Sequence, residues 1–209
     1  MEINNNSDTI SYRNGLECDY SLKLLLLGDS SVGKSNFILR LIKDKFSPSH
    51  VSTSGMELKT TEILLDKYKI RVQLWDTAGQ EKYRAITKCL FTKVQGILPL
   101  YDITNEDSFN NLKHWVKMIK DECYNIQLLM IGNKNDLEDD RVISMEEATE
   151  YAKNQKMAYI ETSSKTGENV NKAIETICKK ILKNNKVKSN YSFSLDCKKS
   201  HKEKRKCCE

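Results

Sequence analysis

The chain has 209 residues, of which 39% are hydrophobic and 30% are charged, so it can form one domain with a buried core and two tails. Its formal net charge of +5 lies at the C-terminal end, because residues 183–209 carry nine Lys/Arg and three Asp/Glu and the remainder is close to neutral. This distribution argues against a nucleic-acid-binding surface on the domain. The sequence has neither the apolar run of about 18 residues that a membrane helix needs nor a signal peptide. Seven scattered cysteines without metal-ligand spacing indicate reduced thiols in the cytosol.

Residues 1–19 are polar and have no hydrophobic period, so we expect a disordered extension. The apolar run Ser21–Leu27 predicts a buried strand, and the residues from the end of the next loop to about Lys43 predict a helix with one apolar side. Between them stands Gly28–Ser35, which fits the phosphate-loop pattern G-x-x-x-x-G-K-[ST]. A glycine loop can match this pattern by chance, but strand, glycine loop and helix in this order aim backbone N–H groups at one anion.

The loop offers three kinds of contact to a nucleotide. Its backbone N–H groups surround the phosphates, the Lys34 ammonium adds a charge near the β- and γ-phosphates, and the Ser35 hydroxyl can bind Mg²⁺. The predicted nucleotide-binding residues of this stretch are Asp29, Ser30, Ser31, Val32, Gly33, Lys34, Ser35 and Asn36.

Strands and helices alternate along the rest of the domain. Leu58–Leu65 and Lys69–Asp76 are alternating runs around a short turn, which predicts an antiparallel hairpin. Further strands are expected at Gly96–Asp102, Gln127–Gly132 and Ala158–Thr162. Helices are expected from Asn105 or Thr104 to about Tyr124, from Ser144 to about Lys156, and from Asn169 to about Leu182. This order predicts the α/β class with a mostly parallel sheet.

Pro99 is unexpected inside the apolar strand Gly96–Asp102. Proline lacks the N–H group that a central strand uses for its ladder. We expect a bulge or a missing ladder bond at this position, with a modest loss of stability.

Polar residues follow the strand that ends near Asp76. A carboxylate at this place beside a phosphate loop is suited to holding Mg²⁺ through water. Gly79 can bring its N–H group close to a phosphate, and the amide of Gln80 can orient an attacking water. We therefore predict Gln80 and Lys34 as the catalytic residues.

The motif Asn133-Lys134-Asn135-Asp136 ends another strand. A carboxylate there can accept the two adjacent N–H groups of guanine, whereas adenine would leave it unpaired; such a site can discriminate by about 10⁴ or more. Ser163-Ser164-Lys165 closes the last strand and can place an N–H group near the base carbonyl. The predicted base-binding residues are therefore Asn133, Lys134, Asp136, Ser163, Ser164 and Lys165.

Taken together and in this order, these four motifs resemble the nucleotide-binding set of Ras-like small GTPases, from about Tyr20 to Leu182. The resemblance implies a P-loop NTPase fold (Ras-like G domain), with a six-stranded, mostly parallel sheet containing one antiparallel strand and helices on both faces. It divides the chain into an extension (1–19), a GTP-binding domain (20–182) and a flexible basic tail (183–209). It also implies that Mg²⁺ is bound by Ser35, Thr53 and Asp76, and that Phe46 packs against the guanine.

Within this superfamily, Asp76–Thr87 and Tyr101–Phe109 resemble the Rab branch. The end of the chain, with Cys207 and Cys208 before Glu209, resembles the double-cysteine ends that Rab proteins have geranylgeranylated. Two lipid chains and nearby basic residues give durable membrane binding, although a basic run such as Lys198–Lys206 is more often a solvated end.

The Rab resemblance implies a monomeric switch of vesicle traffic that works on the cytoplasmic face of an intracellular membrane and cycles with the cytosol. Its implied partners are GTP or GDP, an exchange factor, a GTPase-activating protein, a GDP-dissociation inhibitor, a prenyltransferase with its escort protein, and effectors. Leu58 and Leu90 stand where Rab proteins usually carry aromatic residues, whereas Trp75 matches. These differences indicate either drift at tolerant positions or altered effector specificity.

Two functions of different classes remain open from the sequence. The first is a switch that hydrolyses GTP, slowly unless a partner supplies an arginine. The second is a scaffold that holds GTP or GDP with little cycling, which the altered switch segments suggest but Gln80, Thr53 and Ser35 oppose. An ATP-dependent kinase is disfavoured by Asp136 and by the absence of a lid for a phosphate acceptor.

Overall fold

The computed structural model describes residues 18–48, 55–77, 91, 93–123 and 126–188. In chain order its elements are β1 (Tyr20–Leu27), α1 (Lys34–Lys43), β2 (Met56–Leu65), β3 (Tyr68–Thr77), β4 (Gly96–Asp102), α3 (Glu106–Glu122), β5 (Gln127–Asn133), the 3₁₀ helix η2 (Glu138–Asp140), α4 (Met145–Asn154), β6 (Ala158–Thr162) and α5 (Val170–Lys188). Every strand and α-helix predicted from the sequence is present, with ends that differ by a few residues.

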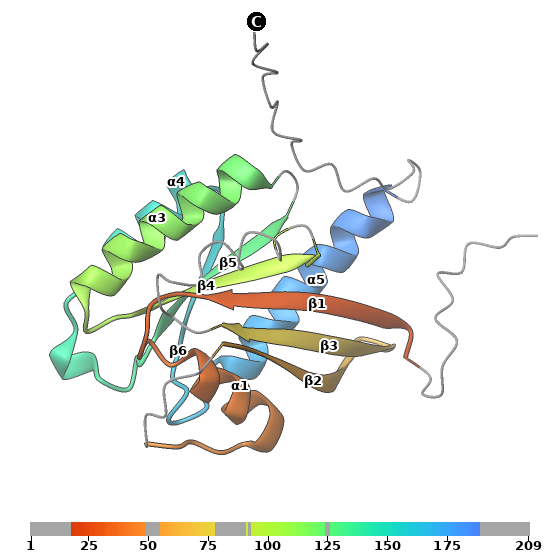
Figure 1. The fold of residues 1–209 in the computed structure, drawn as a ribbon, viewed down its shortest axis with the longest axis horizontal. Helices are drawn as coiled ribbons and strands as arrows, with labels where there is room; N and C mark the ends of the chain where they lie inside the picture. Colours follow the sequence, from red (N-terminus) through yellow and green to blue (C-terminus); the bar gives the residue numbers. More distant parts are fainter. Residues whose placement is uncertain (1–17, 49–54, 78–90, 92, 124–125, 189–209) are drawn as a thin grey trace, which may run out of the picture.

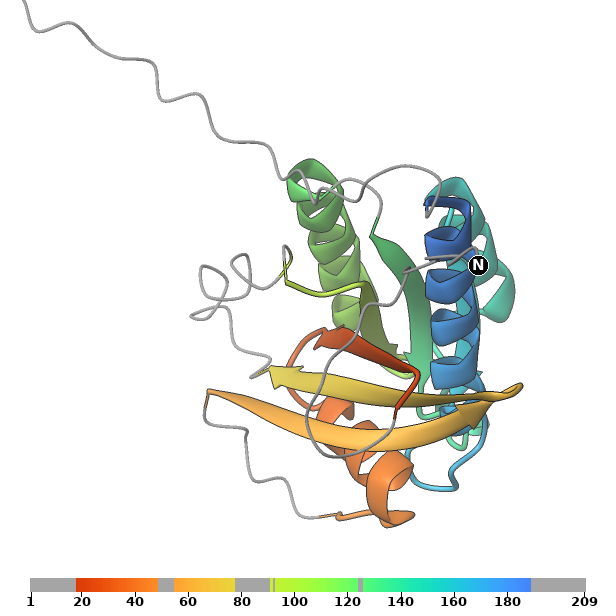
Figure 2. The same cartoon turned by 90° about the vertical axis from the view of Figure 1, so that its right-hand side faces the viewer.

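The six strands form a single sheet in the order β2-β3-β1-β4-β5-β6. Only β2 is antiparallel to its neighbour, β3, and every other pairing is parallel. Figures 1 and 2 show α3 and α5 on opposite faces of this sheet. The predicted fold, a mostly parallel six-stranded sheet with one antiparallel strand and helices on both faces, is confirmed.

The buried side chains of β1 explain why it lies in the middle of the sheet. Leu22, Leu24 and Leu26 pack with α1 and α5 on one face, and Leu25 and Leu27 pack with α3 on the other. A strand that is covered on both faces needs a continuous apolar run rather than an alternating one. The apolar sequence of β1 therefore already indicates two layers of helices.

Side chains start two helices at the predicted residues. Asn105 is the N-cap of α3 and accepts a hydrogen bond from the Ser108 N–H at 2.9 Å. Ser144 is the N-cap of α4 and accepts from the Glu147 N–H at 3.1 Å. Such caps satisfy N–H groups that have no partner within the helix, which fixes where the helix begins.

Three boundaries differ from the predictions. Helix α5 continues to Lys188, so the predicted tail boundary at residue 183 falls within a helix. Helix α4 ends at Asn154, two residues early, because Lys156 takes a left-handed backbone conformation with φ of 55°. In the predicted N-terminal extension, Asp19 is bonded to Lys69 through both its N–H group and its carboxylate. No helix among the described residues combines the length and apolarity needed to span a membrane.

Pro99 lies inside β4, where all seven residues are buried. Towards β1 it is paired with Leu27, but towards β5 the pairing skips Leu98 and Pro99 and resumes at Leu100. The register is the same on both sides of this gap, so β4 has no bulge at Pro99. The interruption of the ladder is confirmed, and the bulge that we considered as an alternative is not formed.

We expect Pro99→Val to raise the melting temperature, because valine restores the N–H group for the gap in the β4–β5 ladder. One buried hydrogen bond contributes about 1 kcal/mol, which for a chain of this size corresponds to about 2–4 °C. Thermal unfolding of the two proteins under the same conditions measures the difference. Pro48→Val changes the other proline, in an exposed loop, and is expected to give no increase. An equal or lower melting temperature for Pro99→Val would refute the prediction.

Candidate nucleotide-binding site

The residues predicted to bind a nucleotide gather at one edge of the sheet. Because the parallel strands all end there, the phosphate loop after β1, Asp76 of β3, Asn133 of β5 and the loop after β6 lie at the same edge as the start of α1. This is the usual position of ligands in open α/β sheets. The predicted residues Thr53, Gly79 and Gln80 lie outside the described part of the chain, as do Cys207 and Cys208.

Two glycines set the shape of the phosphate loop. Gly28 has φ of 144°, and a Cβ atom there would lie 2.2 Å from the Leu100 carbonyl oxygen. Gly33 has φ of 98° and is the N-cap of α1, and its Cβ atom would lie 2.3 Å from Asn133 Nδ2. Both positions require glycine because of the backbone conformation and the close neighbours. Ser31, with φ of 65°, completes a turn that leads directly into the N-terminus of α1.

Lys34 is buried at the start of α1 and is held by its own loop. Its Nζ donates to the carbonyl oxygens of Gly28 at 2.9 Å and Asp29 at 2.6 Å. Burial lowers the pKa of Lys34 to about 8, and the charges of Asp76 and Asp29 partly oppose this shift. An ammonium group in a site with little water is more strongly attracted to an anion than one on the surface. The position is therefore suited to a phosphate chain.

Asp76 is the group that best fits a metal ion. It is buried, with 4% of its surface exposed, and its Oδ1 is a buried atom without a hydrogen-bond partner in the described structure. Burial raises the pKa of this carboxyl group, while a hydrogen bond from Ser35 and the charge of Lys34 oppose the rise. An unpaired carboxylate oxygen beside a serine hydroxyl matches the oxygen ligands that Mg²⁺ prefers. The described residues thus fit the predicted metal site.

Asn133 connects the phosphate loop to the loop that follows β6. Its Nδ2 donates to the Val32 carbonyl oxygen at 2.8 Å. Its Oδ1 accepts from Thr162 Oγ1 at 3.1 Å and from the N–H and Oγ of Ser164 at 3.2 and 3.1 Å. The side chain of Asn133 therefore joins three segments of the site, a role that the sequence alone did not reveal.

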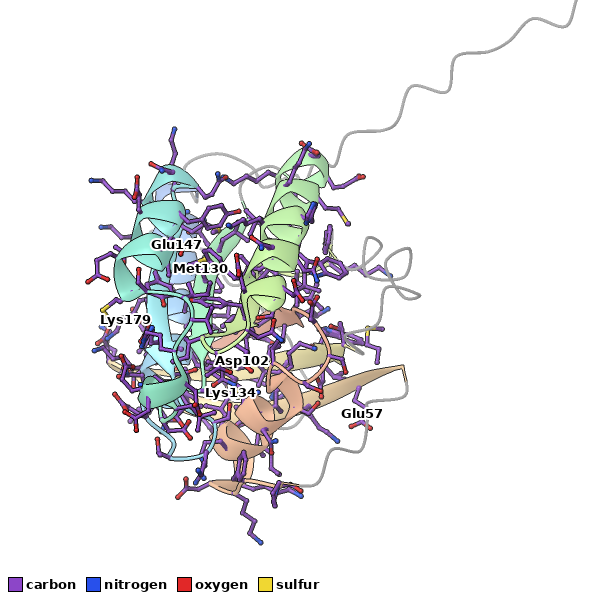
Figure 3. The ribbon with its side chains drawn as sticks, turned by 90° about the vertical axis from the view of Figure 1, so that its left-hand side faces the viewer. Glu57, Asp102, Met130, Lys134, Glu147 and Lys179 are labelled. Atoms are coloured by element: carbon purple, nitrogen blue, oxygen red, sulfur yellow. The ribbon has the colours of Figure 1, made fainter. Side chains whose placement is uncertain are left out.

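Lys134 and Asp102 form an ion pair at the ends of β5 and β4. Lys134 Nζ lies 2.5 Å from Asp102 Oδ2, and Figure 3 shows the two labelled residues close together. The other carboxylate oxygen of Asp102 accepts hydrogen bonds from the N–H and Oγ1 of Thr104. The ion pair holds the side chain of Lys134 against the end of β4, at the edge of the sheet where the parallel strands end. The sequence analysis included Asp102 in the Rab-like stretch Tyr101–Phe109 but did not predict it as a site residue.

Asp136 and Ser163 bring the two predicted base-binding loops together. Ser163 Oγ donates to Asp136 Oδ1 at 2.5 Å, and the same hydroxyl oxygen accepts from the N–H groups of Lys165 and Thr166. Lys165 Nζ lies 3.6 Å from Asp136 Oδ2. One oxygen of the carboxylate is thus oriented by the Ser163 hydroxyl, and the second faces the exposed ammonium group of Lys165.

Arg40 of α1 and Asn111 of α3 support this edge from outside the motifs. The Arg40 guanidinium donates to the backbone oxygens of Ser164, at 3.1 Å, and of Lys165. Asn111 Nδ2 donates to Asp29 Oδ2 at 2.7 Å, which ties the phosphate loop to α3. Sequence analysis missed both residues, because each lies on a helix without any local pattern that marks its distant partner.

Asn36 holds the segment that carries Phe46. Its side-chain amide forms two hydrogen bonds with the backbone of Ser47, each of 3.0 Å. Phe46 is 38% exposed, so part of its side chain is accessible to a ligand. The predicted contact between Asn36 and the nucleotide remains a prediction, because the amide is directed to Ser47.

Comparisons with known proteins agree with this geometry. The family model described as "Ras family" matches residues 23–183. The chain is 42% identical over 168 residues to the GTP-binding protein ypt3 of Schizosaccharomyces pombe, covering 80% of this chain and 78% of the relative. It is 40% identical over 178 residues to the Ras-related protein SEC4 of Saccharomyces cerevisiae, covering 85% and 81%. It is 42% identical over 168 residues to the human Ras-related protein Rab-3A, covering 78% and 76%.

We expect Asn36→Ala to accelerate GDP dissociation, because the segment with Phe46 loses both of its bonds to the start of α1. Loss of two hydrogen bonds of about 0.5–1.5 kcal/mol each predicts a rate about five- to tenfold higher or more. Stopped-flow release of a fluorescent GDP analogue measures this rate. Asn154→Ala, at the exposed end of α4 just before β6 begins, is the matched control and should behave like the unaltered protein. Equal rates for all three proteins would contradict the proposed role of Asn36.

Proposed function

This chain belongs to the Ras family as a Rab-type small GTPase, a GTP hydrolase that regulates vesicle traffic, and we propose that the edge of the sheet described above is its site for GTP or GDP with Mg²⁺. The observation that carries this proposal is the contact between Asp136 and Ser163, because it joins two loops around one carboxylate. Family membership favours the GTP-hydrolysing switch over the scaffold that scarcely cycles.

The phosphates are bound at the start of α1 in this proposal. The N–H groups of residues 29–36 surround the phosphate chain, and Lys34 exchanges its carbonyl partners for phosphate oxygens. Ser35 and Asp76 would hold Mg²⁺, joined by Thr53 in the GTP form, and the ion would supply positive charge beside the phosphate oxygens.

The base is selected by the two loops that follow β5 and β6. Asp136 accepts two N–H groups from guanine, and the backbone of Ser163, Ser164 and Lys165 lies on the side of the base carbonyl. Phe46 packs against the guanine ring. Lys134, which forms an ion pair with Asp102, lies over the part of the site that binds the base. Adenine offers no matching pair of donors and would leave the Asp136 carboxylate without partners.

Hydrolysis proceeds by in-line attack of water on the γ-phosphorus. Gln80 orients this water, while Lys34 and the loop N–H groups stabilise the charge that spreads over the phosphate oxygens. We expect the intrinsic rate to be slow, about 10⁻⁴–10⁻³ s⁻¹, and a GTPase-activating protein to accelerate it. An exchange factor replaces GDP by GTP, and effectors bind the GTP form.

The C-terminal residues place the switch on a membrane. A prenyltransferase with its escort protein modifies Cys207 and Cys208, and the basic residues before them add about 1 kcal/mol each near an anionic surface. A GDP-dissociation inhibitor returns the protein to the cytosol. The G domain of this proposal spans residues 20–182 together with the remainder of α5, and the basic tail follows it.

We expect Asp136→Asn to lose guanine selectivity. The amide replaces one acceptor oxygen by a donor, so GDP affinity falls at least about 100-fold, whereas xanthosine diphosphate gains a partner for its additional carbonyl group. Competition binding with both nucleotides in the presence of Mg²⁺ measures the change. Asp139→Asn, an exposed residue of η2, is the matched control. If Asp136→Asn still prefers GDP over xanthosine diphosphate as strongly as the unaltered protein does, another group recognises the base.

Single-turnover hydrolysis separates the switch from the scaffold. We expect the GTP-loaded protein to release phosphate slowly, and a Rab-directed GTPase-activating protein to accelerate this release. In the presence of the activating protein, Gln80→Leu should release phosphate at least about tenfold more slowly than the unaltered protein. Gln73→Leu changes a glutamine in β3, away from the phosphate loop, and serves as control. Absence of phosphate release even with the activating protein would favour the scaffold.

A further inference from the structure

A continuous chain of polar side chains lies beside the base-binding loops. The hydroxyl groups of Tyr101 and Tyr159 are 2.7 Å apart, and Tyr159 donates to Glu161 Oε1 at 2.6 Å. Arg141 donates from Nη1 and Nη2 to the two oxygens of Glu161 at 2.9 and 2.8 Å. Its Nε and Nη2 also donate to the two oxygens of Glu138 at 2.8 and 2.6 Å.

The inner part of this chain is buried. The side chain of Glu161 is 6% exposed and that of Arg141 is 15% exposed, while Tyr101 is fully buried. Burial raises the pKa of Tyr159, so its hydroxyl group keeps the proton that it donates to Glu161. A buried charge pair costs desolvation and is stable only when its hydrogen bonds are complete. Arg141 and Glu161 meet this condition through their bidentate contact.

The network touches β5 immediately before its base-binding motif. A Cβ atom on Gly132 would lie 2.7 Å from the Tyr159 hydroxyl oxygen and 2.8 Å from that of Tyr101. Glycine at this position therefore allows the two hydroxyl groups to reach each other beside the strand. The next residue along the chain is Asn133, which binds the phosphate loop.

The pair also joins the segment that follows the first motif to the strand β6, which leads into the second. Arg141 lies five residues after Asp136, and its Nη1 donates to the Ile143 carbonyl oxygen at 3.0 Å. Glu161 lies two residues before Ser163, whose hydroxyl orients Asp136. The Glu161 carbonyl oxygen accepts from Asn169 Nδ2 at 2.9 Å, just before α5 begins. Both members of the pair therefore lie within five residues of the Asp136–Ser163 contact along the chain.

From this geometry we propose that Arg141 and Glu161, supported by the Tyr159 hydroxyl, are positioning residues for guanine selectivity. They touch neither the base nor the phosphates in the proposed site, and they act by holding Asp136 and Ser163 in register. The inference rests on the proposed guanine site. A merely structural pair would affect every nucleotide equally, whereas a positioning pair affects those that bond to Asp136 most.

The dissociation rates of GDP and inosine diphosphate from the full chain, in the presence of Mg²⁺, test this proposal. Inosine diphosphate has the same phosphates and ribose but lacks the 2-amino group, and so makes one fewer bond to Asp136. We expect Arg141→Gln to release GDP about tenfold faster and inosine diphosphate only about two- to threefold faster, so the preference for GDP shrinks. Tyr159→Phe, which keeps the charge pair, should change the ratio in the same direction by a smaller factor.

Arg71→Gln is the matched control, because it removes an arginine that pairs with Glu62 at 3.4 Å near the other edge of the sheet. It should leave the ratio of the two rates unchanged. Equal acceleration of GDP and inosine diphosphate in Arg141→Gln, or no change in either, overturns the inference. If Arg141→Gln does not fold, an unchanged ratio in folded Tyr159→Phe overturns it instead. Failure of the unaltered protein to bind GDP overturns the proposed guanine site itself, which is a separate result.

Discussion

The side-chain amide of Asn133 is the contact on which the nucleotide edge of the sheet depends. It donates to the phosphate loop and accepts from the segment that follows β6, so it spans from the turn before α1 to the turn before α5. Its Nδ2 also occupies the space that a side chain at Gly33 would need. Together with Arg40, this amide group therefore links the proposed phosphate-binding and base-binding parts of the site, which suits a ligand whose base and phosphates are at a fixed distance.

Around this contact, each base-binding residue is held by a partner from a different element. Lys134 is held by Asp102 of β4, and the carbonyl groups of the last loop are held by Arg40 of α1. Hydrogen bonds to charged groups are shorter and stronger than those between neutral groups, and they fix direction as well as distance. In the proposed site, the loops that would recognise the base are thus held in place by the sheet and helices before any ligand contact is made. Pre-organisation of this kind reduces the ordering cost of binding.

Local patterns predicted most of the fold because its elements agree with their own sequences. The apolar run of β1 predicts a strand covered on both faces, and Asn105 and Ser144 start their helices as expected. The motifs likewise predicted which loops would meet at the site. The partners Asp102, Asn111 and Arg141 could not be predicted, because their contacts depend on the packing of distant elements rather than on nearby residues. Helix α5 extends beyond its predicted end for a similar reason. The spacing of apolar residues shows where the buried face of a helix ends, but it does not show where the helix itself ends.

Buried polar groups and buried apolar groups lie in different parts of this fold, and the two sets serve binding and stability respectively. Among the described residues, the buried polar and charged side chains all lie at the ends of strands on the nucleotide edge or in the first turns that follow them; they are Lys34, Asp76, Thr77, Asp102, Ser108, Asn133, Glu161, Thr162, Ser163 and Ser164. The remaining buried side chains of the described sheet and helices are hydrophobic and form the core, and Tyr101 adds a hydroxyl group to it. Buried charges contribute little net stability compared with apolar residues of similar size, so a chain selected for stability alone would not concentrate them in one place. Their concentration at this edge is explained by the need to bind a charged ligand with defined orientation. The cost of burying them is offset by the apolar layers on both faces of the same sheet.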